Sequence, residues 1–231
     1  WRVIPLHHVE HGQCSCNRHK CTSPGKHPRT RHGLKDGTTD KSKIRGWWKQ
    51  WTNANIGIVT GEISGFFALD IDPDKGGSDS LVELTNSYGQ LPDTLSQTTG
   101  GNGKHYLFAQ IGTEIKGSIS KVGCGIDIRG DCGYILVPPS NHISGGTYSW
   151  DLAIDHTPIV PAPEWLLHLI KFPPLEMPMV SNKQSADGKA YEGGRNTYLT
   201  SAGGKLRHEG KTKGQITITL LEENRLNCIP P

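Results

Sequence analysis

Short apolar segments, rich in β-branched and aromatic residues and separated by glycine and proline, dominate the first three quarters of this 231-residue chain. Such segments are typical of β-strands, which we expect at residues 56–60, 66–71, 94–98, 105–108, 125–128 and 134–137. Apolar side chains recur at helical spacing in 78–88 and 165–170, where we expect two helices. Many strands with few helices predict an α+β fold.

The predicted strand at 66–71 carries one carboxylate, Asp70, and a second follows directly after it, Asp72. Residues i and i+2 of a strand point to the same face, so these side chains are expected to project together. Carboxylates held that close repel unless a cation lies between them, which favours a divalent-metal site. Asp127, in a later predicted strand, is the third candidate ligand. The simpler alternative is that an aspartate only ends the strand and starts the turn at 73–77.

A glycine-rich loop at 99–103 runs into a predicted strand that begins near Lys104 and His105. Backbone N–H groups freed by glycines, together with a cation, are what an anionic phosphate needs. The spacing is not that of a P-loop, because no Gly-Lys-Ser/Thr opens a helix here. A plain hairpin turn followed by a surface histidine explains the same residues, and this segment alone does not decide between the two.

Taken in order, these segments resemble the archaeo-eukaryotic primase superfamily, in its bifunctional primase-polymerase branch. Asp70 and Asp72 match its Asp-x-Asp/Glu motif, His105 matches the histidine of its Ser-x-His motif, and Asp127 matches its apolar-Asp motif. Gly103 stands where the family has the serine. Segments 55–61 and 133–140 are also similar to this branch.

The resemblance implies an open, mixed sheet with an RRM-like core and a template-directed DNA primase/polymerase activity. In such an enzyme Asp70, Asp72 and Asp127 would hold Mg²⁺ or Mn²⁺, and a (d)NTP would react with a primer 3′-hydroxyl on a DNA template. The residues implied for nucleotide binding are Gly103, Lys104, His105 and Arg129. A backbone N–H or Lys104 would replace the missing serine, while Arg129 has the alternative of pairing with a surface carboxylate.

A short loop at 11–28 concentrates cysteine and histidine. Closely spaced thiols and an imidazole fit a tetrahedral zinc site. The expected ligands are Cys14, Cys16, Cys21 and His27, with His11 and His19 as alternates for the fourth place. Free thiols or disulfides are the alternative, although the odd number of thiols in the loop argues against a secreted disulfide framework. Zinc would have a structural role, ordering a loop that has few apolar residues.

Basic residues are concentrated between residues 18 and 45, although the formal net charge is only +3. That segment is suited to a phosphate backbone. Trp47, Trp48 and Trp51 follow at helical spacing, which favours core positions for at least two of them over base stacking.

No apolar run is long enough to span a bilayer, and no signal peptide opens the chain. Reduced thiols and nucleic-acid chemistry indicate a cytoplasmic location.

We expect three parts: a primase-polymerase domain at 1–175, a polar linker at 176–190, and the beginning of a small helical module at 191–231. The last part resembles the primase carboxy-terminal module through residues 192–196 and 222–225. Since the chain starts without methionine, we expect it to be a piece of something longer. The resemblance implies that the parent is a larger replication primase-helicase of a mobile element, with the helicase region following.

Two rival functions remain. A non-catalytic, zinc-stabilised DNA-binding module for replication initiation predicts DNA affinity that survives removal of Asp70 or Asp72. A two-metal nuclease would use the same carboxylates to activate water. The glycine-rich loop speaks against the nuclease, because a nuclease has no need for a triphosphate site.

Overall fold

The computed structural model describes residues 1–173, 190–191, 211–212, 215, 217–221 and 228–229. The chain divides into two units, Trp1–Pro174 and Leu175–Pro231. In the second unit, strands β12 (Ala190–Tyr191) and β13 (Cys228–Ile229) pair in parallel. The expected linker, apart from its last residue, and most of the expected carboxy-terminal module lie outside the described residues.

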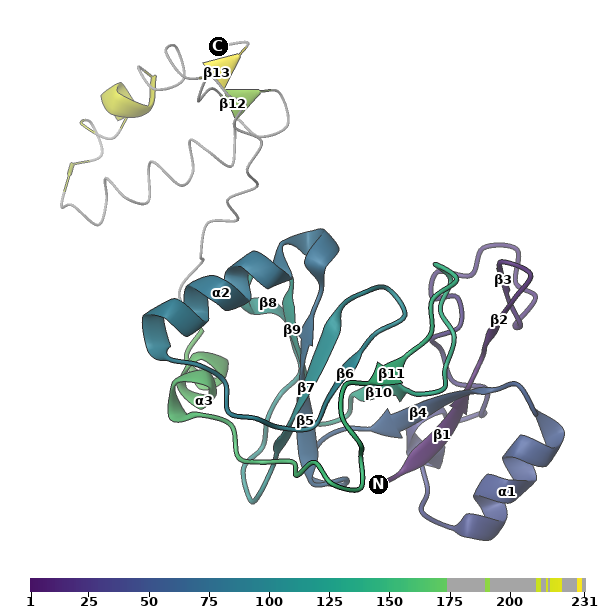
Figure 1. Cartoon of the computed structure of the whole chain (residues 1–231). Helices are drawn as coiled ribbons and strands as arrows, with labels where there is room; N and C mark the ends of the chain where they lie inside the picture. The colour runs from purple at the N-terminus through teal and green to yellow at the C-terminus, as the bar shows by residue number, and fades with distance from the viewer. Residues whose placement is uncertain (174–189, 192–210, 213–214, 216, 222–227, 230–231) are drawn as a thin grey trace. The chain divides into compact units, whose positions relative to one another are not determined.

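A six-stranded sheet forms the centre of the first unit (Figure 1). Its strand order is β11 (Ser149–Trp150), β6 (Ser96–Thr98), β7 (Lys104–Ala109), β5 (Phe66–Ile71), β9 (Ile126–Arg129) and β8 (Ser118–Gly123). Every neighbouring pair in it is antiparallel, so the expectation of a mixed sheet is wrong here. Short hairpin loops join β6 to β7 and β8 to β9, and a hairpin makes its two strands antiparallel.

Strand β5 continues through the short 3₁₀ turn η2 (Pro73–Lys75) into helix α2 (Gly77–Tyr88) and then to β6. Because β7 lies between β5 and β6 and is antiparallel to both, β5 and β6 run in the same direction. The segment is therefore a split β-α-β unit. This connection places the end of β5 beside the loop that joins β6 to β7.

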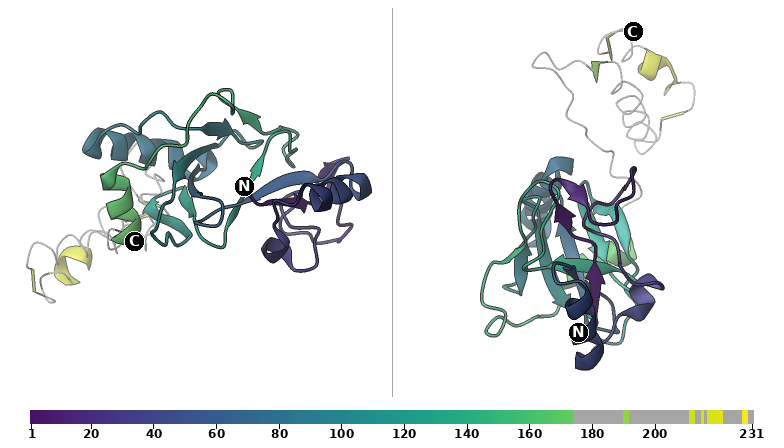
Figure 2. Two further views of the ribbon diagram at one scale, coloured as in Figure 1. Left: turned by 90° about the horizontal axis from the view of Figure 1, so that it is seen from below. Right: turned by 90° about the vertical axis from the view of Figure 1, so that its right-hand side faces the viewer.

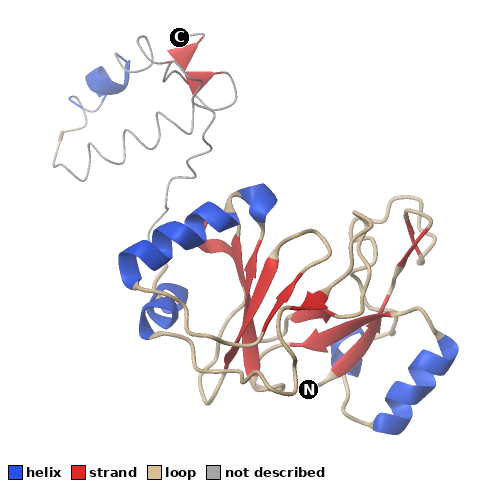
Figure 3. Cartoon of the chain, in the orientation of Figure 1, coloured by secondary structure: helices blue, strands red, loops and turns tan. Residues whose placement is uncertain are grey.

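The central strand β5 has apolar residues on both faces, which is why it reads as a continuous apolar run. Phe67, Leu69 and Ile71 are buried against helices α2 and α3 (Glu164–Lys171), which both cover one face of the sheet (Figure 3). In α2, Leu84 is buried in this cluster while Val82 is 57 % exposed.

A second, three-stranded sheet lies on the other side, in the order β1 (Val3–Leu6), β4 (Asn55–Val59) and β10 (Tyr134–Val137). Residues Ile58 and Ile135 of this sheet pack with Phe66 and Ala68 of β5. The apolar residues of β5 thus alternate between two cores. Asp70, near the end of β5, is on the same face of the strand as Phe66 and Ala68, and it follows them directly past the edge of this second core.

The remaining elements are β2 (Val9–Glu10), β3 (Gln13–Cys14), the 3₁₀ helix η1 (Gly33–Asp36) and helix α1 (Lys41–Gln50). The left-hand view of Figure 2, like Figure 1, shows α1 and the pair α2 and α3 at opposite ends of the first unit. Trp47, Trp48 and Trp51 are half-buried, so the expectation of core positions for at least two of them is wrong. The Trp48 indole donates to the Ala54 carbonyl at 3.2 Å, and the Arg29 guanidinium lies 5.2 Å from the Trp51 ring centre.

No helix in the described part of the chain has the length and apolar character needed to cross a bilayer.

Candidate active-site cleft and metal group

A cleft of about 480 Å³ opens at the acidic end of β5. Its volume is within the range of about 300–1,000 Å³ that is typical of small-ligand sites. Residues that line it come from β5, β7, β9, the glycine-rich loop and the cysteine-rich loop. The predicted site residues that the structure brings together here are Asp70, Asp72, Gly103, His105, Asp127 and Arg129.

Asp70 is the centre of this group. In the antiparallel sheet it is the direct partner of His105 on β7 and of Asp127 on β9. Directly opposite side chains on one face of a sheet have Cβ atoms about 4.5–5.5 Å apart. The pairing of β5 with both neighbours therefore gathers residues that lie far apart in the sequence.

Arg129 neutralises the two facing aspartates. Its Nη2 lies 2.8 Å from Asp70 Oδ2 and 3.0 Å from Asp127 Oδ2. Burial alone would raise the pKa of Asp70, but the hydrogen bonds and charges of His105 and Arg129 outweigh it and hold that pKa well below its usual range. Burial also disfavours the charged form of Arg129 and so lowers its pKa, but the paired carboxylates more than offset this effect. Both groups are therefore charged at neutral pH.

His105 is buried and is held on both sides of its ring. Its Nε2 lies 3.3 Å from Asp70 Oδ1, and its Nδ1 lies 2.7 Å from Nε2 of Gln97. The same Gln97 nitrogen donates to the Leu136 carbonyl at 2.6 Å. A Gln97 that donates to Nδ1 leaves the proton on Nε2, so the imidazole donates to Asp70 and its orientation is fixed.

Asp72 lies at the junction of β5 and the 3₁₀ turn. Its Oδ1 accepts the Asp74 N–H at 3.2 Å, and its Oδ2 pairs with Lys75 Nζ at 2.7 Å. The hydrogen bond from Lys75 to Asp72 raises the pKa of Lys75. Asp72 thus begins a turn, as the simpler alternative expects, and also lines the cleft.

Two of the predicted nucleotide-binding residues take other roles. Lys104 does not line the cleft: it is adjacent to His105 in β7, so it points to the opposite face, where Nζ pairs with Asp151 at 2.7 Å. The Gly103 N–H donates to Thr99 Oγ1 at 2.9 Å. A Cβ at Gly103 would come within 2.5 Å of the Ile71 carbonyl oxygen, so glycine is required by close approach to β5.

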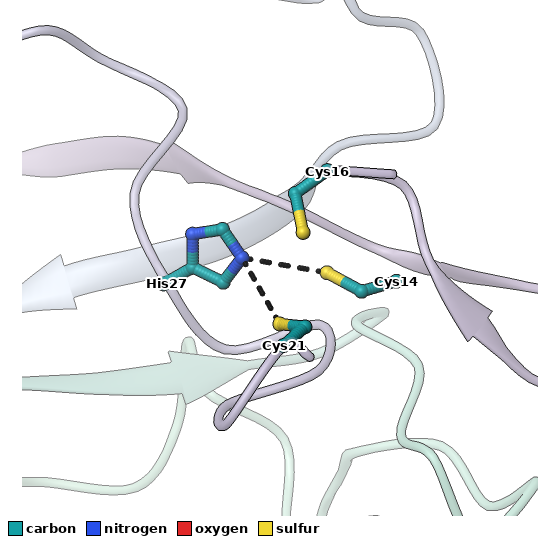
Figure 4. Close-up of side chains that lie close together, drawn as sticks. All are labelled: Cys14, Cys16, Cys21 and His27. Atoms are coloured by element: carbon teal, nitrogen blue, oxygen red, sulfur yellow. Dashed lines mark hydrogen bonds between the residues drawn. The ribbon is translucent and has the colours of Figure 1, made fainter. Parts of the chain in front are cut away.

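A second cluster forms in the cysteine-rich loop (Figure 4). The ligand atoms of Cys14, Cys16, Cys21 and His27 all lie within 4.8 Å of one another, a group that can hold a zinc ion. His27 Nε2 is 3.4 Å from Cys14 Sγ and 3.5 Å from Cys21 Sγ. The alternates His11 and His19 are not part of the group. Among the residues that the structure describes, the three aspartates of the cleft do not form so compact a set.

The surroundings of this group favour the ligand forms of His27 and Cys16 but not the thiolate form of Cys21. Burial lowers the pKa of His27, and so does the charge of Arg18, which keeps the imidazole neutral as metal binding requires. The backbone N–H of Arg18 lowers the pKa of Cys16, whereas burial raises that of Cys21. The Gly25 N–H donates to Cys14 Sγ at 3.3 Å, and such outer hydrogen bonds orient a ligand.

Comparison with known families identifies the family of the chain. Residues 1–165 match the family described as bifunctional DNA primase/polymerase, N-terminal, which is more than half of the 231-residue chain. The chain belongs to this family. A search of curated proteins finds no match. Membership of a primase/polymerase family implies that the domain binds DNA and nucleotides.

The cleft of this primase/polymerase domain also contains residues that sequence reasoning missed. Lys26 lines it from the cysteine-rich loop, and Tyr148 and His142 line it from the segment after β10. Burial raises the pKa of Tyr148, and the charge of Asp70 raises it further, so the phenol remains a hydrogen-bond donor at neutral pH. The position of Lys26 next to His27 was a usable signal. Nothing in the local sequence pointed to Tyr148.

Proposed function

We propose that this domain is a template-directed nucleotidyltransferase that adds a nucleotide from a (d)NTP to a primer 3′-hydroxyl. The observation that carries the proposal is the side-by-side placement of Asp70, His105 and Asp127 on three neighbouring strands at a cleft. These residues are the ones that match the motifs of the family. The antiparallel order of β6, β7, β5 and β9 with α2 as the connection supports the RRM-like core that the resemblance implies.

The donor set of the cleft fits Mg²⁺ or Mn²⁺. Asp70, Asp72 and Asp127 line one cleft and offer hard oxygen ligands, which these ions prefer. The ions would lower the pKa of the primer hydroxyl and neutralise charge that builds up at the reacting phosphorus. The depressed pKa of Asp70 keeps it ionised at neutral pH, which suits a metal ligand better than a proton donor.

The cations of the cleft supply the phosphate contacts. Arg129 and Lys75 already lie within hydrogen-bond distance of Asp70 and Asp72, so a triphosphate held by those carboxylates through metal ions comes within their reach. His105 holds Asp70 in position through Nε2. In the reaction the primer oxygen bonds to the α-phosphorus, the bond to pyrophosphate breaks, and the hydroxyl proton passes to water.

The template would follow the basic surface of the amino-terminal half. Helix α1 presents Lys41, Lys43, Arg45 and Lys49 to solvent. Lys43 Nζ lies 5.3 Å from the centre of the Trp47 ring, so this helix combines charge with a half-buried aromatic side chain, a combination found in single-strand binding sites. On the resemblance alone, we further propose that the chain belongs to a larger cytoplasmic primase-helicase of a mobile element.

The test is incubation of an end-labelled primer on a DNA template with Mg²⁺ or Mn²⁺, with and without nucleoside triphosphates. We expect elongation only when triphosphates are present. Shortening of the primer without triphosphates would instead establish the nuclease. An unchanged primer that is still bound by the protein would favour the non-catalytic DNA-binding module.

A further inference from the structure

The cysteine-rich loop is fixed against the three-stranded sheet of the primase/polymerase domain at the position of Lys26. The Lys26 carbonyl accepts the Tyr134 hydroxyl at 2.6 Å, and the neighbouring Gly25 carbonyl accepts Asn55 Nδ2 at 2.9 Å. On the other side of Lys26 follows His27, one of the four side chains of the metal group. The backbone of Lys26 is therefore held between the second sheet and the metal group.

The Lys26 side chain lines the active-site cleft together with Ser23 of the same loop. Asp70 and Asp72 line the same cleft, so the ammonium of Lys26 and these two carboxylates share one site. Among the described residues its ammonium has no hydrogen-bond or ion-pair partner. By contrast, Lys75 and Arg129 in the same cleft each pair with a carboxylate at 2.7–2.8 Å.

We infer that the cysteine-rich loop forms an anion subsite for the triphosphate of the incoming nucleotide, with Lys26 as its cation and the Cys/His metal group as its anchor. The inference rests on the proposed function, because it names a ligand contact of the same cleft. It gives the metal group a role in substrate binding in addition to the structural one.

A nucleotide triphosphate fits this position better than a phosphate of the DNA backbone. Lys26 lines the same cleft as the carboxylates that would hold the metal ions, so a triphosphate bound through those ions comes within reach of its ammonium. The basic helix α1 offers an open surface for the DNA backbone elsewhere. A single ammonium adjacent to a phosphate acts as a point charge that strengthens binding without fixing a geometry.

The decisive experiment measures binding of an Mg²⁺–nucleoside triphosphate and of the matching monophosphate to the full chain, by titration calorimetry without DNA. The variant is Lys26→Ala, and Lys20→Ala is the matched control, because Lys20 is in the same loop, is exposed and does not line the cleft. We expect Lys26→Ala to weaken triphosphate binding about tenfold, with monophosphate binding and zinc content unchanged. Lys26→Arg should keep most of the affinity.

Equal triphosphate affinity in Lys26→Ala and wild type would overturn the subsite while leaving the proposed function intact. An equal loss for triphosphate and monophosphate, or a loss of DNA affinity only, would overturn it too. Absence of triphosphate binding in the wild type would instead contradict the proposed function itself.

The anchoring role is tested by Cys16→Ser, which removes one half-exposed ligand of the metal group. We expect this variant to lose zinc and to bind the triphosphate about as weakly as Lys26→Ala. Adding Lys26→Ala to it should then have almost no further effect, because both changes remove the same contact. Additive losses in the double variant, or full triphosphate affinity in folded, zinc-free Cys16→Ser, would overturn the anchor.

Discussion

Arg129 donates two hydrogen bonds to a single oxygen of Asp70, Oδ2, from Nε at 3.0 Å and from Nη2 at 2.8 Å. The same Nη2 donates to Asp127 at 3.0 Å. One guanidinium thus neutralises two carboxylates that face each other across β5 and β9. A divalent ion at these carboxylates would provide the same neutralisation, so ion and guanidinium compete for Asp70 Oδ2.

This competition predicts how Arg129→Ala responds to metal. Without divalent ions the variant should lose about 1.5 kcal/mol of unfolding free energy, the low end for charged hydrogen bonds, because the Arg129 side chain is 37 % exposed. Mn²⁺ should raise the Tm of the variant more than that of the wild type, as measured by thermal unfolding. Arg45→Ala, on exposed helix α1, is the control. Equal gains for wild type and Arg129→Ala would contradict the competition.

Asp151, on the face of the six-stranded sheet that is opposite to the cleft, should make the stability of the protein depend on pH. It accepts hydrogen bonds from Lys104, Thr98 and Ser96 at 2.7, 2.8 and 2.6 Å. Burial would raise the pKa of Asp151, but these bonds lower it. The contribution is therefore complete above the unfolded pKa of about 3.9 and is lost as the pH falls through the lower folded pKa.

Accordingly, Asp151→Asn should lower the unfolding free energy by about 1 kcal/mol at pH 7. The difference in unfolding free energy between this variant and the wild type should shrink as the pH falls below about 4, because the wild-type carboxyl is then protonated and is neutral, like the asparagine amide. Urea unfolding of both proteins across this pH range measures it. A difference in unfolding free energy that stays constant, or grows in acid, would contradict a lowered pKa of Asp151 in the folded protein.

The expectation from the sequence and the structure differ in the role of Lys104. The sequence suggests that its loss weakens nucleotide binding, whereas the structure places it on the face opposite the cleft, paired with Asp151. We expect Lys104→Ala to change triphosphate affinity by less than about twofold, and Lys75→Ala, within the cleft, to weaken it about fivefold. Calorimetric titration decides this. A larger effect from Lys104→Ala would show that the strand orientation is wrong.

Local patterns made much of this site predictable. The apolar run that leads to Asp70 indicated a buried strand. The four metal-group side chains lie within one loop, so their spacing pointed to them, with His11 and His19 as alternates for the fourth place. Alternation along β7 puts Lys104 and His105 on opposite faces of the sheet, yet both were expected to bind the nucleotide.

Long-range pairing could not be read from the sequence. The placement of Asp127 beside Asp70 depends on which strands become neighbours and in what register. The same holds for Lys26 and Tyr148, which reach the cleft from loops far from β5 in the sequence. Strand β1 and helix α1 were missed because β1 is short and the tryptophans of α1 and its C-cap are only half-buried.

Primer extension by folded Asp70→Asn tests the central claim most directly. The substitution removes the charge that pairs with His105 and Arg129 while keeping the size of the side chain. The control is Asp93→Asn, an exposed aspartate that does not line the cleft. We predict that Asp70→Asn extends a labelled primer at least about 100-fold more slowly than the wild type, with Asp93→Asn unchanged. Extension at the wild-type rate by Asp70→Asn would contradict polymerase chemistry at this cleft.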